Sequence, residues 1–335
     1  MMKRTLLCAC LLAVLLALAP LLCLLPVFGT SGSALLRTAD SGSTVQQPDA
    51  TAGPLEEPEP ILLWDTAGQE ILTVPAAEYL AGSAACEVPA SWPDDAILAQ
   101  MVACHSWALY QKEQSGNRTD GAWFSVNTTQ CSGYATEQVL RSRWGAQYDE
   151  TRARFESLAA QVLHTVLLYD GHPAAACYHA ISSGHTESSQ AVWVEPLPYL
   201  QGVDSPWDRY ADNYEVTVRY SRSQMYDILV MNLNLDPDDD PSGWVGEPTW
   251  DEAGYVATIP LCGQEFTGVE VRSALSLRSA CFSITYADGM FTVTTRGYGH
   301  GVGLSQYGAY AMAEGGATWQ EILAYYFPGT ELGER

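Results

Sequence analysis

The sequence predicts an α+β domain made of helices and antiparallel hairpins. A helix start is indicated where Pro93 precedes two acidic residues and an apolar-rich stretch, because proline fits the first helical turn and acids there complement the helix dipole. Two hairpin signals, Asp170-Gly171 and Asp288-Gly289, each join two strand-like runs. Helical and hairpin segments alternate in mixed order along the chain, which favours α+β architecture.

Regular structure is expected to begin near Ile61. A helix is predicted from Asp94 to about Gln111, and a second one over residues 149–164. Strand-like runs are found at 165–169, 174–181, 215–220, 282–286 and 290–294.

The C-terminal segment carries helix start and stop signals. Ser305 is expected to cap a helix that ends at Gly315 and Gly316. Thr318 and Glu321 form a capping box ahead of a last helix over residues 322–327.

The N-terminal segment indicates the cellular compartment of the protein. Lys3 and Arg4 precede an uncharged run from Thr5 to Gly29, which is long enough to span a bilayer with the N-terminus inside. A signal peptide cleaved among the small residues near Ala34 is the alternative. We therefore expect an anchor over residues 1–29, a flexible stalk rich in Ser, Gly, Thr, Pro and acids over 30–60, and one extracytoplasmic domain over 61–335.

The charge of the chain excludes one class of partner. The formal net charge is −23, and the few Lys and Arg residues are scattered. A nucleic-acid-binding protein needs a basic patch that displaces counterions. We therefore expect no nucleic-acid partner.

Glu87 is the first candidate for chemistry. It is the only charged residue between Glu78 and Asp94. Apolar surroundings raise the pKa of a carboxyl because desolvation disfavours the charged form, and a general acid needs such a pKa near neutral pH. An exposed carboxylate in a turn before the next helix is the alternative.

The densest motif is glycine-rich and runs from Arg296 to Ala309. Its glycines at 297, 299, 301 and 303 alternate with other residues, so the backbone can adopt unusual angles and approach a ligand closely. The spacing is neither GxGxxG nor GxxxxGK[ST], which excludes a nucleotide loop. A tight connector between strand and helix is the plain alternative.

Two further segments suggest sites without diagnostic spacing. The segment from Cys177 to Glu187 holds Cys, Ser and two His; His179 and Ser182 could line a sugar site, or a strand could simply run into a polar loop. The acids from Asp236 onward mimic a calcium loop, but Pro241 stands where that loop needs glycine. The cysteines show no CxxC spacing, and their pairing is left open.

Together these segments resemble the stage II sporulation protein D family, whose domain is shared with the amidase enhancers of bacterial cell walls. The matching blocks are Tyr79–Pro89 with Ala99 and Gln100, Tyr178–Glu187 with its continuation to Asp208, Arg272–Phe282, and Gly299–Ala309 with Tyr325–Gly329. They cover most of the chain after the predicted stalk, and the last block is the most specific.

The resemblance implies a lytic transglycosylase of the cell wall. Such members sit at the sporulation septum and cut glycan strands already stripped of peptides by an amidase, stage II sporulation protein P. Stage II sporulation protein M tethers the pair, and the cleavage serves engulfment. Matched position by position, Glu87 takes the catalytic role, acting first as acid and then as base. The residues expected to bind substrate are His179, Ser182, Thr186, Arg278, Gly299, His300, Gly301, Ser305, Gln306 and Tyr307.

The chain departs from the family pattern at two places. His105-Ser106-Trp107 stands where members commonly have Arg-Thr-Tyr. Some members bind zinc near the block that contains Cys131, but here the other ligands are missing, so we expect no metal and no cofactor. The alternative function is a non-catalytic wall-binding module that recruits or stimulates an amidase.

Overall fold

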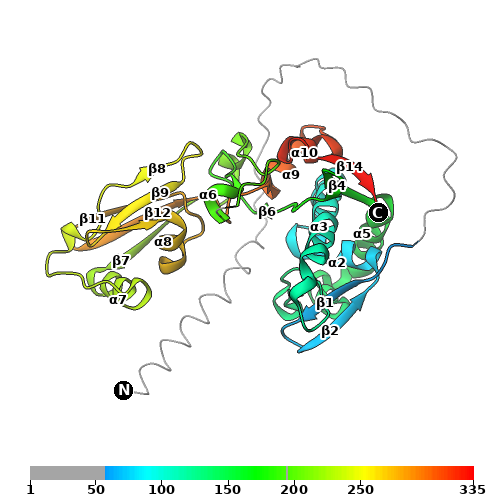
Figure 1. Ribbon diagram of the computed structural model, residues 1–335, viewed down its shortest axis with the longest axis horizontal. Helices are drawn as coiled ribbons and strands as arrows, with labels where there is room; N and C mark the ends of the chain where they lie inside the picture. The colour runs from blue at the N-terminus through cyan, green and yellow to red at the C-terminus, as the bar shows by residue number, and fades with distance from the viewer. Residues whose placement is uncertain (1–56, 194) are drawn as a thin grey trace, which may run out of the picture. The chain divides into compact units, whose positions relative to one another are not determined.

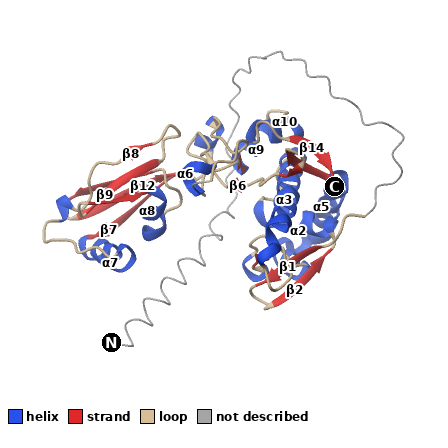
Figure 2. Ribbon diagram, viewed as in Figure 1, coloured by secondary structure: helices blue, strands red, loops and turns tan. Residues whose placement is uncertain are grey.

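The computed structural model describes residues 57–193 and 195–335, in which helices and mostly antiparallel sheets alternate along the chain (Figures 1 and 2). The predicted α+β class is confirmed. The predicted anchor over residues 1–29 and most of the predicted stalk lie outside the described residues. Within the described residues, no helix has both the length and the apolar character that a membrane span requires.

The helices and strands have the following bounds. The helices are α2 Ala76–Glu87, α3 Asp94–Gln114, α4 Glu137–Trp144, α5 Tyr148–Val162, α6 Ser189–Trp193, α7 Arg222–Leu233, α8 Gly268–Leu275, α9 Gln306–Glu314 and α10 Trp319–Tyr326. The strands are β1 Ile61–Asp65, β2 Glu70–Val74, β3 Phe124–Val126, β4 Thr165–Tyr169, β5 His172–Pro173, β6 Tyr178–His179, β7 Glu215–Ser221, β8 Thr249–Trp250, β9 Val256–Leu261, β10 Gln264–Thr267, β11 Phe282–Ala287, β12 Met290–Arg296, β13 Leu304–Ser305 and β14 Glu331–Glu334.

The first hydrophobic core forms around α3. Its residues from Ala96 to Ser106 are all buried, and a helix that is buried on every side must be covered by several elements. α2 and α5 pack on it, as do α9 and α10 from the C-terminal end of the chain and the strand β4. The sheets β2-β1-β3 and β14-β4-β5 complete this part. The C-terminal segment thus closes a core that the N-terminal half begins.

A second core forms between residues 225 and 293. The antiparallel sheet β11-β12-β7 carries α7 (Figure 1), and Trp244 stacks on Phe291 with ring centroids 5.7 Å apart. Helix α8 packs on α7 and on the strands β9 and β10. The sheet β10-β9-β8 adds Ile259 and Leu261. The segment predicted as one domain therefore contains two hydrophobic cores, and the chain returns from the second to the first through the glycine block.

The local signals for hairpins and caps are confirmed. Tyr169 pairs with His172 across the first predicted turn, and Asp288 and Gly289 take positive φ between β11 and β12. Ser305 accepts a hydrogen bond from the Gly308 N–H at the start of α9. The capping box at α10 is present as well.

The strand predicted at 174–181 is wrong for most of its length. Only Tyr178 and His179 form a strand, which pairs in parallel with Leu304 and Ser305. Before it, the Ala176 and Cys177 N–H groups bond to carbonyls two residues back, at 2.8 Å each. These tight γ-type turns use the backbone groups that a ladder would need.

Helix α2 was not predicted, and it changes the setting of Glu87. The helix consists largely of small residues, so its apolar periodicity is weak. Gly82 lets it approach Tyr134, since an added Cβ would lie 2.5 Å from that ring. Glu87 is the last residue of α2, so the alternative of an exposed carboxylate in a turn before α3 is wrong.

Candidate active site

Glu87 is a half-buried carboxyl at the C-terminal end of α2. Burial raises its pKa above the ordinary value. Four groups oppose this by favouring the carboxylate: the Gln306 side chain, the Gly133 N–H, the Arg143 charge and the Tyr178 hydroxyl. Burial outweighs them, which agrees with the expectation from the uncharged neighbourhood. The helix dipole acts in the same direction as burial, because the negative end of α2 is at Glu87.

Gln306 connects Glu87 to the glycine block. Its Nε2 lies 3.5 Å from Glu87 Oε2 and 3.3 Å from Gln100 Oε1. Gln306 is the first residue of α9, directly after the Ser305 cap. Because Ser305 is paired in register with His179, the parallel strand pair determines where the Gln306 side chain points. The structure thus brings two predicted site residues together across the whole domain.

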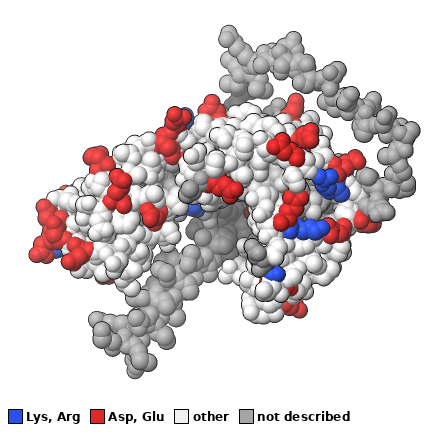
Figure 3. Space-filling model, viewed as in Figure 1, with Lys and Arg blue, Asp and Glu red and all other residues white. Residues whose placement is uncertain are grey.

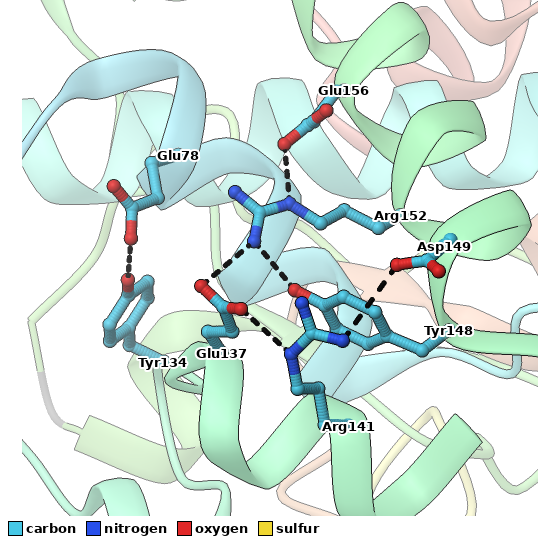
Figure 4. A network of polar contacts seen from close by, with 8 residues as sticks. All are labelled: Glu78, Tyr134, Glu137, Arg141, Tyr148, Asp149, Arg152 and Glu156. Atoms are coloured by element: carbon cyan, nitrogen blue, oxygen red, sulfur yellow. Dashed lines mark hydrogen bonds and ion pairs between the residues drawn. The ribbon is translucent and has the colours of Figure 1, made fainter. Parts of the chain in front are cut away.

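The loop from Ser125 to Tyr134 forms the other side of the site and contributes the Gly133 N–H. Arg143 reaches in from α4 and donates to the Ala85 carbonyl at 2.6 Å. Tyr134 donates to Glu78 on α2 at 2.9 Å, which holds this loop on the helix (Figure 4).

Helices α4 and α5 are joined by the polar network that Figure 4 shows. Arg152 bonds to Glu137 on α4 at 3.1 Å and to Tyr148 and Glu156 on α5 at 2.6 Å each. Arg141 adds a bond to Glu137 at 2.7 Å. Exposed ion pairs contribute little stability singly, but together they fix α4, which carries Arg143.

The glycines of the block are required by contacts within the protein. Gly299 and Gly301 have φ of 123° and 85°, where side chains are rarely tolerated. An added Cβ at Gly299 would lie 2.6 Å from His179 Cβ, and one at Gly301 would lie 2.7 Å from Tyr255 Oη. We expected these glycines to make room for a sugar. In the structure, the atoms that leave no room for a side chain at these positions belong to the protein itself. Contact of this loop with substrate stays a prediction.

Several residues predicted to bind substrate are buried in an internal network. Ser182 and Ser305 are fully buried, and their hydroxyls donate to the two carboxylate oxygens of Asp208, the second bond at 2.8 Å. Thr186 is also fully buried, and its Oγ1 accepts from the Val203 N–H at 2.9 Å. In this structure these hydroxyls hold the glycine block and its partner loop together, and any contact of theirs with substrate remains untested.

The remaining predicted residues lie around the same block. The His179 Nδ1–H donates to the Val302 carbonyl, and the Val302 N–H donates to His300 Nδ1, both at 3.1 Å. Burial lowers the pKa of His179 to about 3 and that of His300 to about 4, so both are neutral at physiological pH. The Arg278 guanidinium stacks over the Tyr298 ring at 4.2 Å.

Tyr307 belongs to a row of aromatic side chains beside the site. Its ring lies 5.5 Å from that of Tyr310, which lies 5.1 Å from that of Trp92. The Tyr307 hydroxyl donates to the Tyr210 carbonyl at 3.1 Å, and the Tyr210 side chain is 82% exposed. Trp92 follows Glu87 by five residues, and Tyr310 lies one helical turn after Gln306, so the row begins next to the site.

Two departures from the family pattern can now be placed. His105 is buried in the core and donates from Nδ1 to the Thr165 carbonyl at 3.1 Å, and burial lowers its pKa to about 4; it is therefore a neutral core residue. Within the described residues, no group of three or more His, Cys, Asp or Glu is placed to hold a metal ion. The absence of a metal requirement stays a prediction.

Known proteins resemble this chain in the segment that contains Glu87. A family model described as stage II sporulation protein matches residues 65–169, which include Glu87. The chain is 33% identical over 279 residues to stage II sporulation protein D of Bacillus subtilis (strain 168), covering 83% of this chain and 80% of that one. The chain belongs to the stage II sporulation protein D family.

Two further relatives support this family membership. The stage II sporulation protein D of Bacillus amyloliquefaciens is 30% identical over 96% of this chain and 94% of its own length. An amidase enhancer of Bacillus subtilis is 24% identical over 73% of this chain but only 39% of its own. The predicted resemblance is confirmed, and it places this sporulation-family chain beside a distant amidase enhancer that shares the domain.

Three residues around Glu87 were missed as site residues. Gln100 and Tyr178 stand in the sequence blocks that resemble the stage II sporulation protein D family. The signal for Gln100 was a polar residue in an apolar helix, and the signal for Tyr178 was its place next to His179. Arg143 had no such signal. Its place depends on how α4 packs against α2, which the sequence does not reveal.

Proposed function

We propose that this protein is a peptidoglycan lytic transglycosylase that cleaves peptide-stripped glycan strands and leaves 1,6-anhydro-muramic ends. Glu87 carries the proposal. It is a half-buried carboxyl whose pKa is raised by burial, and it stands where members of this family are expected to carry their catalytic glutamate. A raised pKa increases the fraction of the carboxyl that is protonated at a given pH, which is the change that a general acid requires.

One carboxyl can perform both halves of this reaction. Protonated Glu87 gives its proton to the glycosidic oxygen as the bond to C1 breaks. The resulting carboxylate takes the proton from the C6 hydroxyl of the muramic residue, whose oxygen closes on C1. No water attacks, so the second carboxylate of ordinary glycosidases is not needed.

The surroundings of Glu87 support both protonation states. Burial favours the neutral acid before cleavage. The Gln306 amide and the Gly133 N–H stabilise the carboxylate once the proton has left, and the Arg143 charge favours it as well. Opposed effects of this kind keep the two states close in free energy, which suits a group that must release and regain one proton.

The aromatic row of Trp92, Tyr310 and Tyr307 supports a glycan substrate. Aromatic faces offer flat apolar area with polar edges, to which the faces of sugar rings are complementary. The net charge of −23 argues against a nucleic-acid partner. On the face that Figure 3 shows, the Lys and Arg side chains lie singly or beside acids and form no continuous patch over the described residues there.

The cellular setting is part of the proposal. We place the domain outside the cytoplasm at the sporulation septum, held by a single-pass anchor over residues 1–29. Its substrate strands would come from an amidase such as stage II sporulation protein P, with stage II sporulation protein M as the membrane tether. Cleavage of the stripped strands would serve engulfment.

A second candidate function is a non-catalytic wall-binding module that stimulates an amidase. The observation that favours it is the relative named amidase enhancer. The aromatic row would serve binding alone just as well. In that case Glu87 would bind without transferring a proton.

Product analysis distinguishes the two functions. The full-length protein is incubated with peptide-free glycan strands, and the products are analysed by mass spectrometry. A lytic transglycosylase leaves anhydro ends that are lighter by one water than the products of hydrolysis. If no anhydro ends form but an added amidase is stimulated, the binding module is the correct function.

A further inference from the structure

Two cysteines meet directly beside Glu87. Cys86 precedes Glu87 at the end of α2, and Cys131 follows the short helix Thr128–Gln130 in the opposite loop. Their Sγ atoms lie 2.7 Å apart although 45 residues separate them in sequence. In the described part of the chain, the other cysteines make no such contact with another sulfur.

Both backbones around this pair are fixed. Cys131 adopts a left-handed conformation with φ 52°, which is uncommon for a residue with a side chain. The loop is closed beneath it by two hydrogen bonds between Asn127 and Ser132, at 3.0 Å each. On the other side, the end of α2 is held by the Val88 N–H bond to the Ala84 carbonyl at 3.0 Å. The loop thus holds one sulfur against the other at little further entropic cost.

We propose that Cys86 and Cys131 form an intramolecular disulfide that ties the end of α2 to the loop. A disulfide needs sulfur atoms about 2.05 Å apart, with Cβ atoms about 4 Å apart, so the pair needs only a small movement to bond. Neither side chain is fully buried, so an oxidant can reach them. Disulfides persist in extracytoplasmic compartments, which is where the N-terminal anchor predicted from the sequence would place this domain.

Thiol–disulfide exchange with a protein or small-molecule disulfide provides the bond. The hydrogen bond from Cys86, together with the Arg143 charge, lowers the pKa of the Cys131 thiol, while burial raises that of Cys86. The Cys131 thiolate therefore attacks one sulfur of the oxidant and releases the other as a thiolate. Cys86 then loses its proton to water, attacks the Cys131 sulfur and displaces the second thiolate. Two thiols of the chain are oxidised and one disulfide of the oxidant is reduced.

The bond would join the two sides of the Glu87 site. One side is α2 with Glu87 itself, and the other is the loop whose Gly133 N–H favours the Glu87 carboxylate. Fixing their distance positions that donor, so Cys86 and Cys131 act as positioning residues. This consequence for activity rests on the proposed function, whereas the disulfide itself does not.

The linkage is tested on the full-length protein, denatured under non-reducing conditions in the presence of N-ethylmaleimide. Digestion after Lys, Arg and Glu yields peptide 79–87, which contains Cys86 alone, and peptide 119–137, which contains Cys131 alone. The expected result is a single linked product of these two peptides that separates on reduction, with Cys104, Cys177, Cys262 and Cys281 alkylated. If Cys86 and Cys131 are both alkylated even after incubation with oxidised glutathione, the proposal is overturned.

Thermal unfolding gives a second measurement. Reduction should lower the melting temperature of the wild type by about 5–10 °C, given the usual contribution of a disulfide and the size of the domain. Cys131→Ser should have the melting temperature of the reduced wild type, and the reductant should not change it. Cys262→Ser, which removes a half-buried cysteine in the β9–β10 turn, should still respond to it. If reduction lowers the melting temperature of Cys131→Ser as much as that of the wild type, the proposal is contradicted.

Glycan cleavage is measured in both redox states. Reduction should slow it by up to about a hundredfold, the loss that a misplacement of about 1 Å at a catalytic group can cause. If the linkage is found but neither state cleaves glycan, the proposed function fails and the disulfide stands. If glycan is cleaved but no linkage is found, the disulfide proposal fails and the proposed function stands.

Discussion

Replacement of Glu87 by glutamine tests the proposed chemistry most directly. Glutamine keeps the size of the side chain and its oxygen, so it can still accept from the Gln306 amide, which lies 3.5 Å from the carboxylate, and from the Gly133 N–H. It has no proton of carboxyl acidity to transfer. Glu87→Gln should therefore fold and bind peptide-free glycan as the wild type does, yet release no anhydro-muramic ends.

The size of the effect follows from the role. General acid–base catalysis by a positioned group contributes about a hundred- to ten-thousand-fold in rate, which corresponds to about 3–5 kcal/mol of transition-state stabilisation. Binding should change little, because the amide replaces the acid at the same place and the protonated acid is itself uncharged. The loss should therefore appear in kcat and not in KM.

A matched control is available on the same helix. Glu78→Gln makes the same substitution two and a half turns earlier, at an exposed position whose side chain accepts from the Tyr134 hydroxyl, and glutamine can keep that bond. This variant should cleave at the wild-type rate. Mass spectrometry of the digested strands is the assay for both variants. Anhydro ends from Glu87→Gln at a rate near that of the wild type would falsify the assignment of Glu87 as the acid.

Four further predictions follow from particular residues. Because burial raises the Glu87 pKa, the folded state holds this proton more tightly than the unfolded chain. The free energy of unfolding should therefore fall as the pH rises from the pKa of Glu87 in the unfolded chain through its raised pKa in the folded state. The melting temperature of Glu87→Gln, measured over the same pH range, should lack this part of the fall. Gly301→Val should destabilise the protein by about 1–3 kcal/mol from backbone strain alone, plus the clash with Tyr255, whereas Gly289→Val has similar φ (76°) but open space around its Cβ; equal melting temperatures for the two variants would refute the contact. Elemental analysis of the purified protein should find no stoichiometric zinc, and inhibition by a chelator that zinc reverses would contradict this. The full-length chain should be recovered in membranes, whereas a mature N-terminus near Ala34 would mean that the anchor is cleaved.

Features with a local cause were predicted well. The caps at Ser305 and Thr318 and the turns at Asp170-Gly171 and Asp288-Gly289 each depend on a few adjacent residues, whose side chains or backbone angles determine the structure alone. The β11–β12 hairpin and helices α3 and α5 followed from such signals, with boundaries within a few residues. Local consistency of this kind survives folding because tertiary contacts reinforce it.

Features that depend on distant contacts were not predicted. Helix α2 has few large apolar residues and is stabilised by packing of Gly82 against Tyr134 and of Tyr79 in the core. The Ala174–Cys177 segment has the composition of a strand, but its backbone bonds within itself. The close approach of His179 to Gly299 and of Tyr255 to Gly301 was not predicted either. In each case the partner lies far away in the sequence.

The candidate site itself depends on such long-range contacts. Glu87 was assigned from the family resemblance together with its uncharged neighbourhood. Its proton affinity depends on burial and on four groups that oppose it, of which Gln306 lies 219 residues later in the sequence. Gln306 is placed by the strand pair of Ser305 with His179, and that pair requires the backbone angles that the glycines allow. A substitution in the glycine block can therefore alter catalysis without touching substrate, because it moves the amide that stabilises the Glu87 carboxylate. Such a variant would retain glycan binding and show a raised pKa in its pH–rate profile, whereas loss of a direct sugar contact would weaken binding and leave that pKa unchanged.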